Sequence, residues 1–175
     1  YVTGEGTTVV NSYTTLKEYM VENSLDLPDV LTGWTIPSST LYSAMSDYYV
    51  FDIRSADTYN AGHIEGAVNV ALKDVVSKAA DYNDKPIVVV CFTGQTAGHA
   101  VMALRLSGYP DAKVLLFGMS SWNSTLSGSW NSNIGSTGVG HANWVKTATP
   151  ATTTYSAPSI TATATDGPGI LAERV

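Results

Sequence analysis

The sequence has one cysteine, few charged residues and no long hydrophobic run, and each shortage excludes a class of protein. With Cys91 alone no internal disulfide can form, and the three scattered histidines do not suggest a zinc site made with it. Nine Lys and Arg residues against fifteen Asp and Glu residues give a net charge of −6, which disfavours nucleic acid as a partner. The longest strongly apolar run, residues 87–92, is far too short for a membrane span.

The length of 175 residues, 44% of them hydrophobic, predicts one globular domain with extensions. We expect a helical N-terminal extension over 1–33, the core domain over 34–124, an aromatic segment packed on that domain over 125–145, and a Ser/Thr-rich linker with a terminal helix over 146–175. Between residues 119 and 168, 19 of 50 positions are Ser or Thr, so a second core is not expected there. Trp130 and Trp144 interrupt this polar stretch, and large aromatic side chains indicate a segment held against a domain.

Composition also bears on the cellular location of the protein. Low charge, many Ser, Thr and Gly residues and a single cysteine favour an exported, periplasmic bacterial protein, with a cytoplasmic one as the alternative. The terminal run 170–175 has a helix-like apolar pattern and is typical of the start of a further module, as in a tandem array.

The middle of the chain alternates between strand-like and helix-like patterns, which predicts an α/β fold with a parallel sheet. The four uninterrupted β-branched residues of 87–90, opened by Pro86, indicate a central strand buried on both faces. The other predicted strands are 48–53, 67–70 and 114–117, and the predicted helices are 14–23, 38–45, 72–80 and 96–106.

The segment that carries chemistry begins at Cys91, directly after the central strand. In open parallel sheets ligands bind at this edge, and the short loop that follows enters a helix whose N-terminal end favours negative charge. Gly94 allows the loop to curl, so the backbone N–H groups of residues 92–97 can converge on one anion such as a Cys91 thiolate. The alternative is a buried, inert cysteine at the end of a core strand. The polar side chains beside it are Thr93, Gln95 and Thr96, of which Thr96 is the predicted helix N-cap.

Several motifs, in a fixed order over residues 38–122, resemble the rhodanese (sulfurtransferase) family. They are the D-x-R triplet 52–54, Tyr59, the G-H-I-x-G-A run 62–67 followed by Val68 and Asn69, Cys91 with its loop, Leu104, the pair Gly108 and Tyr109, Val114, and the run 117–122. The resemblance implies a five-stranded parallel sheet with helices on both faces and a six-residue active loop, 91–96. It also implies that Cys91 is the catalytic residue, that it carries sulfur as a persulfide, and that no organic cofactor or metal is needed.

The same resemblance implies roles for the neighbours of Cys91. Substrate would be bound by Phe92, Thr93, Gly94, Gln95, Thr96 and Ala97, largely through their amides. Asp52, Arg54 and His63 would be supporting residues, the first two through an ion pair near the site and the third in a turn.

The partners implied are a small sulfur-containing anion as donor, and a thiol, cyanide or a protein as acceptor. The loop side chains Phe92 and Gln95 are neutral where thiosulfate-preferring members are commonly basic, which leaves thiosulfate and mercaptopyruvate both open as donors. Phosphatase chemistry is disfavoured because Ala97 stands where an oxyanion-gripping arginine would be, and no arginine follows before Arg105. The alternative function is a non-catalytic module that binds an anion or carries a persulfide for a partner protein.

Overall fold

The computed structural model describes residues 11–148 and 153–175, in two compact units. Of the described residues, one unit contains 30–145, and the other combines 11–29 with 146–148 and 153–175. Residues 1–10 of the expected N-terminal extension and residues 149–152 of the expected linker lie outside the described residues.

The unit 30–145 is built on a five-stranded sheet in which every strand pair is parallel. In the order β1-β5-β4-β2-β3, the strands are β1 Thr35–Ile36, β5 Lys113–Leu115, β4 Ile87–Val90, β2 Tyr49–Asp52 and β3 Val68–Asn69. This confirms the predicted α/β fold with a parallel five-stranded sheet. The edge strand β1 was not predicted, because two residues give no alternation to detect.

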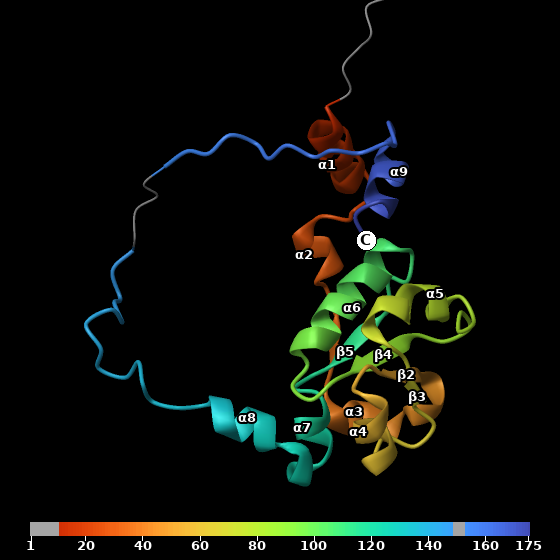
Figure 1. Ribbon diagram of the computed structural model, residues 1–175, viewed down its shortest axis with the longest axis vertical. Helices are drawn as coiled ribbons and strands as arrows, with labels where there is room; N and C mark the ends of the chain where they lie inside the picture. Colours follow the sequence, from red (N-terminus) through yellow and green to blue (C-terminus); the bar gives the residue numbers. More distant parts are fainter. Residues whose placement is uncertain (1–10, 149–152) are drawn as a thin grey trace, which may run out of the picture. The chain divides into compact units, whose positions relative to one another are not determined.

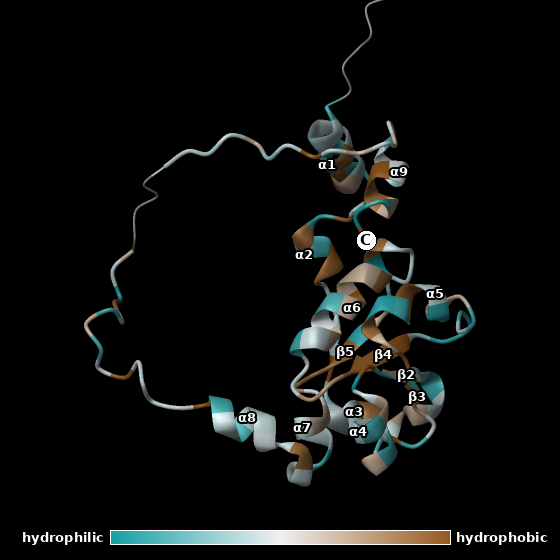
Figure 2. Cartoon of the chain, viewed as in Figure 1, coloured by the Kyte–Doolittle hydropathy of each residue, from teal (hydrophilic) through white to brown (hydrophobic). Residues whose placement is uncertain are grey.

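Strand β4 lies at the centre because it can be buried on both faces. All four of its residues are at most 2% exposed. Ile87 and Val89 belong to one core cluster, whereas Val88 and Val90 belong to the other, as the two-residue period of a strand requires. The sheet interior is coloured hydrophobic in Figure 2.

Helices cover both faces of the sheet (Figure 1). On the Val89 side lie α5 Val75–Ala79 and α6 Gln95–Leu106, and on the Val88 side lie α3 Ser38–Ser43, α4 Ala56–Ala61 and α7 Met119–Trp122. The described residues also form the short elements α2 Leu27–Val30, η1 Met45–Asp47, η2 Leu72–Asp74, η3 Ser124–Leu126 and α8 Gly128–Asn133. The helices predicted over 38–45 and 72–80 are each divided into an α-helix and a 3-10 turn.

The aromatic segment after α7 contacts the domain through Trp130, whose ring meets that of Phe117 edge-on at 5.1 Å. Farther along, Val139 and Trp144 are 80% and 75% exposed. The expectation that this segment is held against the domain as far as Trp144 therefore differs from the structure. The physical reason is that residues 135–141 are mostly Gly, Ser and Thr, with little apolar surface to bury.

The terminal unit pairs α1 Ser12–Glu22 with α9 Gly167–Ala172. The side chains of Leu16, Ile170 and Leu171 are buried. Helix α1 begins earlier than predicted because Asn11 is its N-cap, with Oδ1 accepting a hydrogen bond from the Thr14 N–H.

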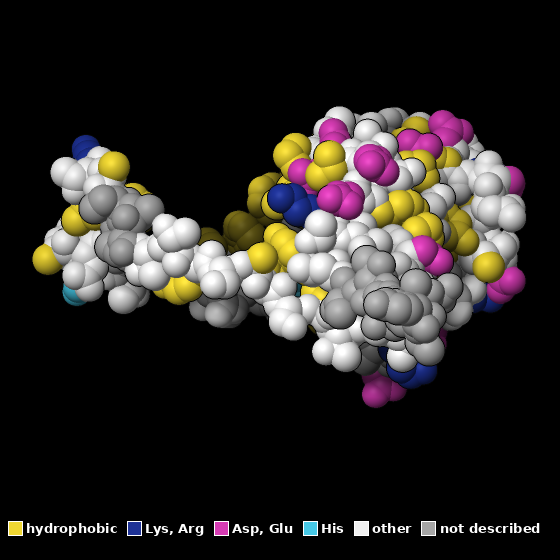
Figure 3. Space-filling view, turned by 90° about the horizontal axis from the view of Figure 1, so that it is seen from above, with side chains coloured by type: hydrophobic (Ala, Val, Ile, Leu, Met, Phe, Trp, Pro, Cys, Tyr) yellow, Lys and Arg dark blue, Asp and Glu magenta, His cyan; other side chains and the backbone are white. Residues whose placement is uncertain are grey.

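Across the described ranges, no helix has both the length and the apolar character to cross a membrane. Figure 3 shows acidic side chains among neutral and apolar ones on one face, in keeping with the net charge of −6.

Candidate active site

Cys91 follows the last residue of β4 and lies at the carboxyl edge of the parallel sheet. The register pairs Val90 with Asp52, the last residue of β2, so both strand ends meet at this edge. The Cys91 side chain belongs to the core cluster of the α6 face and is 7% exposed. It is a free thiol, held where ligands of open α/β sheets bind.

The loop after Cys91 turns back over the sulfur. The Gly94 N–H donates a hydrogen bond to Cys91 Sγ across 3.2 Å. Helix α6 starts at Gln95 with Gly94 as its N-cap, at φ +87°. The prediction that Thr96 is the N-cap is wrong, because the left-handed turn that the loop needs falls at residue 94. A Cβ there would lie 3.3 Å from Leu115 O, so the position is also tight.

The segment between β5 and α7 fixes the other side of the loop. Cys91 O accepts a hydrogen bond from the Met119 N–H at 2.8 Å, and Phe92 O accepts from the backbone N–H and the hydroxyl of Ser120 at 3.0 and 2.8 Å. Gly118 allows this approach, since a Cβ on it would lie 2.3 Å from Cys91 O. In a trans peptide the N–H points opposite to the C=O, so the Phe92 and Thr93 N–H groups point away from α7.

The loop therefore carries several N–H groups with no acceptor in the described part of the protein. Three are the first N–H groups of α6, which no helix satisfies internally. Within the part of the chain that the structure describes, hydrogen bonds are absent from the N–H groups of Phe92, Thr93, Gln95, Thr96 and Ala97. Together with the Gly94 N–H on the sulfur, these are donors for an anionic ligand.

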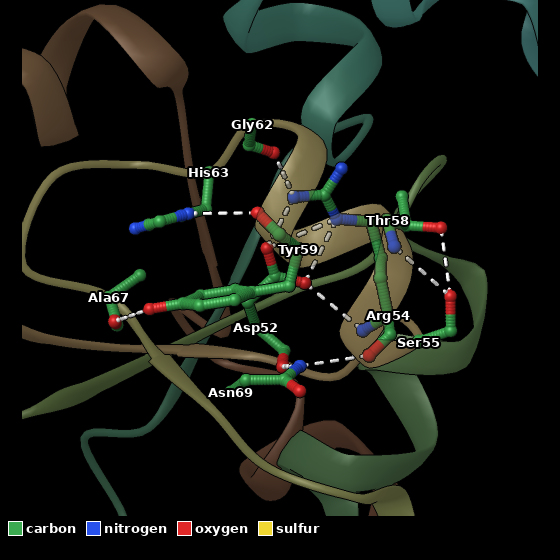
Figure 4. A network of polar contacts seen from close by, with 9 residues as sticks. All are labelled: Asp52, Arg54, Ser55, Thr58, Tyr59, Gly62, His63, Ala67 and Asn69. Atoms are coloured by element: carbon green, nitrogen blue, oxygen red, sulfur yellow. Dashed lines mark hydrogen bonds and ion pairs between the residues drawn. The ribbon is translucent and has the colours of Figure 1, made fainter.

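Asp52 and Arg54 form a buried ion pair beside the loop (Figure 4), with side chains 0% and 1% exposed. Arg54 Nε donates to Asp52 Oδ1 at 2.9 Å, and Nη2 donates to Oδ2 at 2.5 Å and to Gly62 O at 2.8 Å. The Arg54 guanidinium carbon also lies 5.5 Å from the centre of the Phe92 ring. Arg54 thus joins the end of β2 and the turn after α4 to the first loop residue after Cys91.

His63 belongs to the turn after α4 rather than to the loop. Its ring stacks on Tyr59 with centroids 3.8 Å apart, and its Nδ1 lies 2.8 Å from Tyr59 O. The Tyr59 hydroxyl in turn donates to Ala67 O at 2.5 Å (Figure 4). These contacts all hold the turn together, so the geometry gives His63 no catalytic contact.

Arg105, the next arginine after the loop, has a structural role, because its hydrogen bonds go to backbone carbonyls of the fold. It is 6% exposed and donates to Ala112 O, Val30 O and Thr32 O at 2.8 to 2.9 Å. Burial lowers the pKa of its guanidinium below the ordinary value.

No group of three His, Cys, Asp or Glu side chains able to hold a metal occurs in the described ranges.

A cavity of about 510 Å³ opens beside the loop. Its lining comes from Phe92, Thr93 and Gln95 of the loop and from Ser129, Trp130, Asn133 and Ile134 in or next to α8. Cys91 does not line this cavity. Sequence reasoning did not find the α8 wall; the available signal was the spacing of Trp130 and Ile134, one helical turn apart.

Comparisons with known proteins agree on one family. The family model described as Rhodanese-like domain matches residues 38–125. The chain is 39% identical over 79 residues to a thiosulfate sulfurtransferase GlpE of Pseudomonas fluorescens, covering 43% of this chain and 71% of the relative. It is 33% identical over 75 residues to the protein of the same name from Shewanella oneidensis, covering 42% and 74%. A crystal structure of a rhodanese-related protein from Thermoplasma volcanium superposes with a TM-score of 0.47 at 26% identity, covering 50% of this chain and 88% of that one.

Proposed function

The chain belongs to the rhodanese-like domain family, and from this premise we propose that it is a sulfurtransferase in which Cys91 carries the transferred sulfur as a persulfide. One observation carries the proposal: the Cys91 sulfur accepts a hydrogen bond from the Gly94 N–H, inside a loop whose other N–H groups have no acceptor among the described residues. Such a loop suits an anion one atom longer than a thiolate. Hydrogen bonds to a charged group contribute about 1.5–3 kcal/mol each, so a few converging amides suffice without a basic side chain.

In the first step the Cys91 thiolate attacks the outer sulfur of a sulfane donor. With thiosulfate, a sulfur–sulfur bond forms to Cys91 while the original sulfur–sulfur bond breaks, and sulfite leaves with the bonding electron pair. The negative charge passes from the thiolate to the terminal persulfide sulfur, where the N–H groups of residues 92–97 can stabilise it. In the second step a nucleophilic acceptor takes that sulfur and Cys91 leaves as the thiolate.

The loop is already shaped for this chemistry. The carbonyls of Cys91 and Phe92 are bonded to Met119 and Ser120, so the loop need not reorganise to turn its amides toward an anion. The Arg54 guanidinium is neutralised by Asp52 and acts as support under Phe92.

Intact mass spectrometry tests the proposal. Reduced wild-type protein and the Cys91→Ser variant are incubated with thiosulfate and, separately, with mercaptopyruvate. We expect the wild type alone to gain the mass of a sulfur atom, and cyanide to remove it as thiocyanate. Sulfur transfer by Cys91→Ser would contradict the mechanism. A wild type that loads no sulfur from either donor would favour a binding module or a carrier loaded by a dedicated protein.

From composition alone we also propose an exported, periplasmic location. Fractionation of cells that express the full reading frame tests it, and recovery in the cytoplasm would contradict it.

A further inference from the structure

The cavity beside the active loop has one wall that lies outside the residues matched by the family model. The family match ends at residue 125, whereas α8 begins at Gly128. Trp130 of α8 is braced by its edge-on contact with Phe117, which follows β5. The cavity is therefore formed by the loop after Cys91 and by a helix outside the matched region.

The lining offers apolar contact and neutral hydrogen bonding. Phe92, Trp130 and Ile134 supply apolar surface, and no charged side chain is among the lining residues. Arg54 contacts Phe92 but is itself buried and paired with Asp52, so it brings no free positive charge to the cavity.

The polar lining groups suit amides. Asn133 Nδ2 donates to Ser129 O at 2.7 Å, and its Oδ1 has no hydrogen-bond partner among the described residues. The Thr93 hydroxyl and the Gln95 side-chain amide are likewise without partners in the described part of the chain. An amide-bearing molecule can both donate to and accept from such groups.

We propose that this cavity binds the body of the sulfur acceptor, and that the acceptor is an organic thiol with amide groups and no charge besides its thiolate. The inference rests on the function proposed above. The acceptor thiolate attacks the outer sulfur of the Cys91 persulfide, a new sulfur–sulfur bond forms, and the bond to Cys91 breaks. Cys91 leaves as a thiolate and the acceptor leaves as a persulfide anion, so the total charge is unchanged.

Size and charge both support this class. A volume of about 510 Å³ lies within the range of small-molecule sites and far exceeds what thiosulfate or cyanide would fill. The acceptor must bring one negative charge up to a persulfide anion. Any carboxylate on its body would add repulsion that no lining cation offsets, in a chain whose net charge is already −6.

Acceptor kinetics test the assignment. Protein that carries sulfur from thiosulfate on Cys91 is mixed with one of three acceptors. They are N-acetylcysteine amide, the anionic mercaptosuccinate, and cyanide, which has no body for the cavity to bind. We expect Trp130→Ala and Asn133→Ala each to raise the KM for N-acetylcysteine amide about tenfold, the equivalent of one good contact. Cyanide turnover should fall by less than turnover with N-acetylcysteine amide, because cyanide has no body to contact the cavity. Asn133→Lys should shift the preference toward mercaptosuccinate.

Matched controls are Trp144→Ala and Asn143→Ala, which remove the same residue types from exposed positions outside the cavity. Both should behave as wild type. A direct binding readout, by NMR titration of labelled protein with S-methylated N-acetylcysteine amide, needs no sulfur transfer. We expect shifts at Trp130 and Asn133.

The results separate the two proposals. Wild-type protein that binds the methylated probe at α8 but loads no sulfur would overturn the sulfurtransferase function and the acceptor role with it, and would leave the cavity only as a binding site for amide-bearing molecules. The cavity assignment is overturned if the probe shifts no α8 resonance, if the α8 variants keep the wild-type KM, or if cyanide turnover falls equally.

Discussion

Replacing Gly118 by alanine tests whether the turn before α7 shapes the active loop. Gly118 adopts φ +57° and ψ −149°, a conformation that residues with a Cβ rarely adopt. The added Cβ would lie 2.3 Å from Cys91 O and 2.8 Å from Gly94 N, both backbone atoms of the loop. Neither atom can move aside as a flexible side chain can, so the loop itself must shift.

The loss of unfolding free energy has two parts, backbone strain and steric collision, and a second glycine separates them. Gly108 has φ +95° and nothing within 4 Å of its Cβ position, so Gly108→Ala adds backbone strain without a collision. That strain amounts to about 1–2 kcal/mol. Gly118→Ala adds to its own strain an overpacking cost of about 1–3 kcal/mol. We expect Gly118→Ala to lose about 2 kcal/mol more unfolding free energy than Gly108→Ala.

Urea unfolding measures this difference, and the rate of sulfur loading onto Cys91 measures its effect on the loop. We expect Gly118→Ala to lower both the urea unfolding midpoint and the rate of sulfur loading. Gly108→Ala should lower the unfolding midpoint alone. Equal unfolding losses for the two variants, or normal sulfur loading by Gly118→Ala, would refute the reasoning.

Two further predictions concern charged side chains. Arg54→Met leaves the Asp52 carboxylate buried without its partner, so we expect a loss of about 3–5 kcal/mol in urea unfolding, partly recovered by adding Asp52→Asn; a loss below about 1 kcal/mol would contradict this. The Thr163 hydroxyl and the N–H groups of Ala164 and Thr163 donate to Glu173 and lower the pKa of its carboxyl from the ordinary 4.5. Because the folded pKa is the lower one, the stabilisation is complete above pH 4.5 and is lost as the pH falls through the folded value. NMR titration of the Glu173 carboxyl should show the lowered pKa, and Thr163→Val should raise it toward 4.5.

Residues whose environment is set locally were predicted well from the sequence. The strand 87–90 matches β4 at both ends, because Pro86 begins it and four β-branched residues suit a strand buried on both faces. The position of Cys91 at the carboxyl edge followed directly from that strand.

Features that depend on distant contacts were not predicted. The N-cap falls on Gly94 rather than Thr96 because the loop passes against Leu115 and Gly118, which sequence spacing does not reveal. The α8 wall was predicted only as part of the aromatic segment 125–145 and not as a helix, because its Ser and Asn residues gave no helix-like apolar pattern.

The central place of β4 has a consequence for the motion of the catalytic sulfur. Hydrogen-bonded neighbours flank β4 on both sides, and the carbonyls just after it are tied to the start of α7. Amide hydrogens in such a strand exchange with solvent only when a large part of the domain opens. We therefore expect β4, the strand that ends directly before Cys91, to be among the slowest-exchanging parts of the fold, which would keep the Cys91 sulfur and the Gly94 N–H together during small fluctuations.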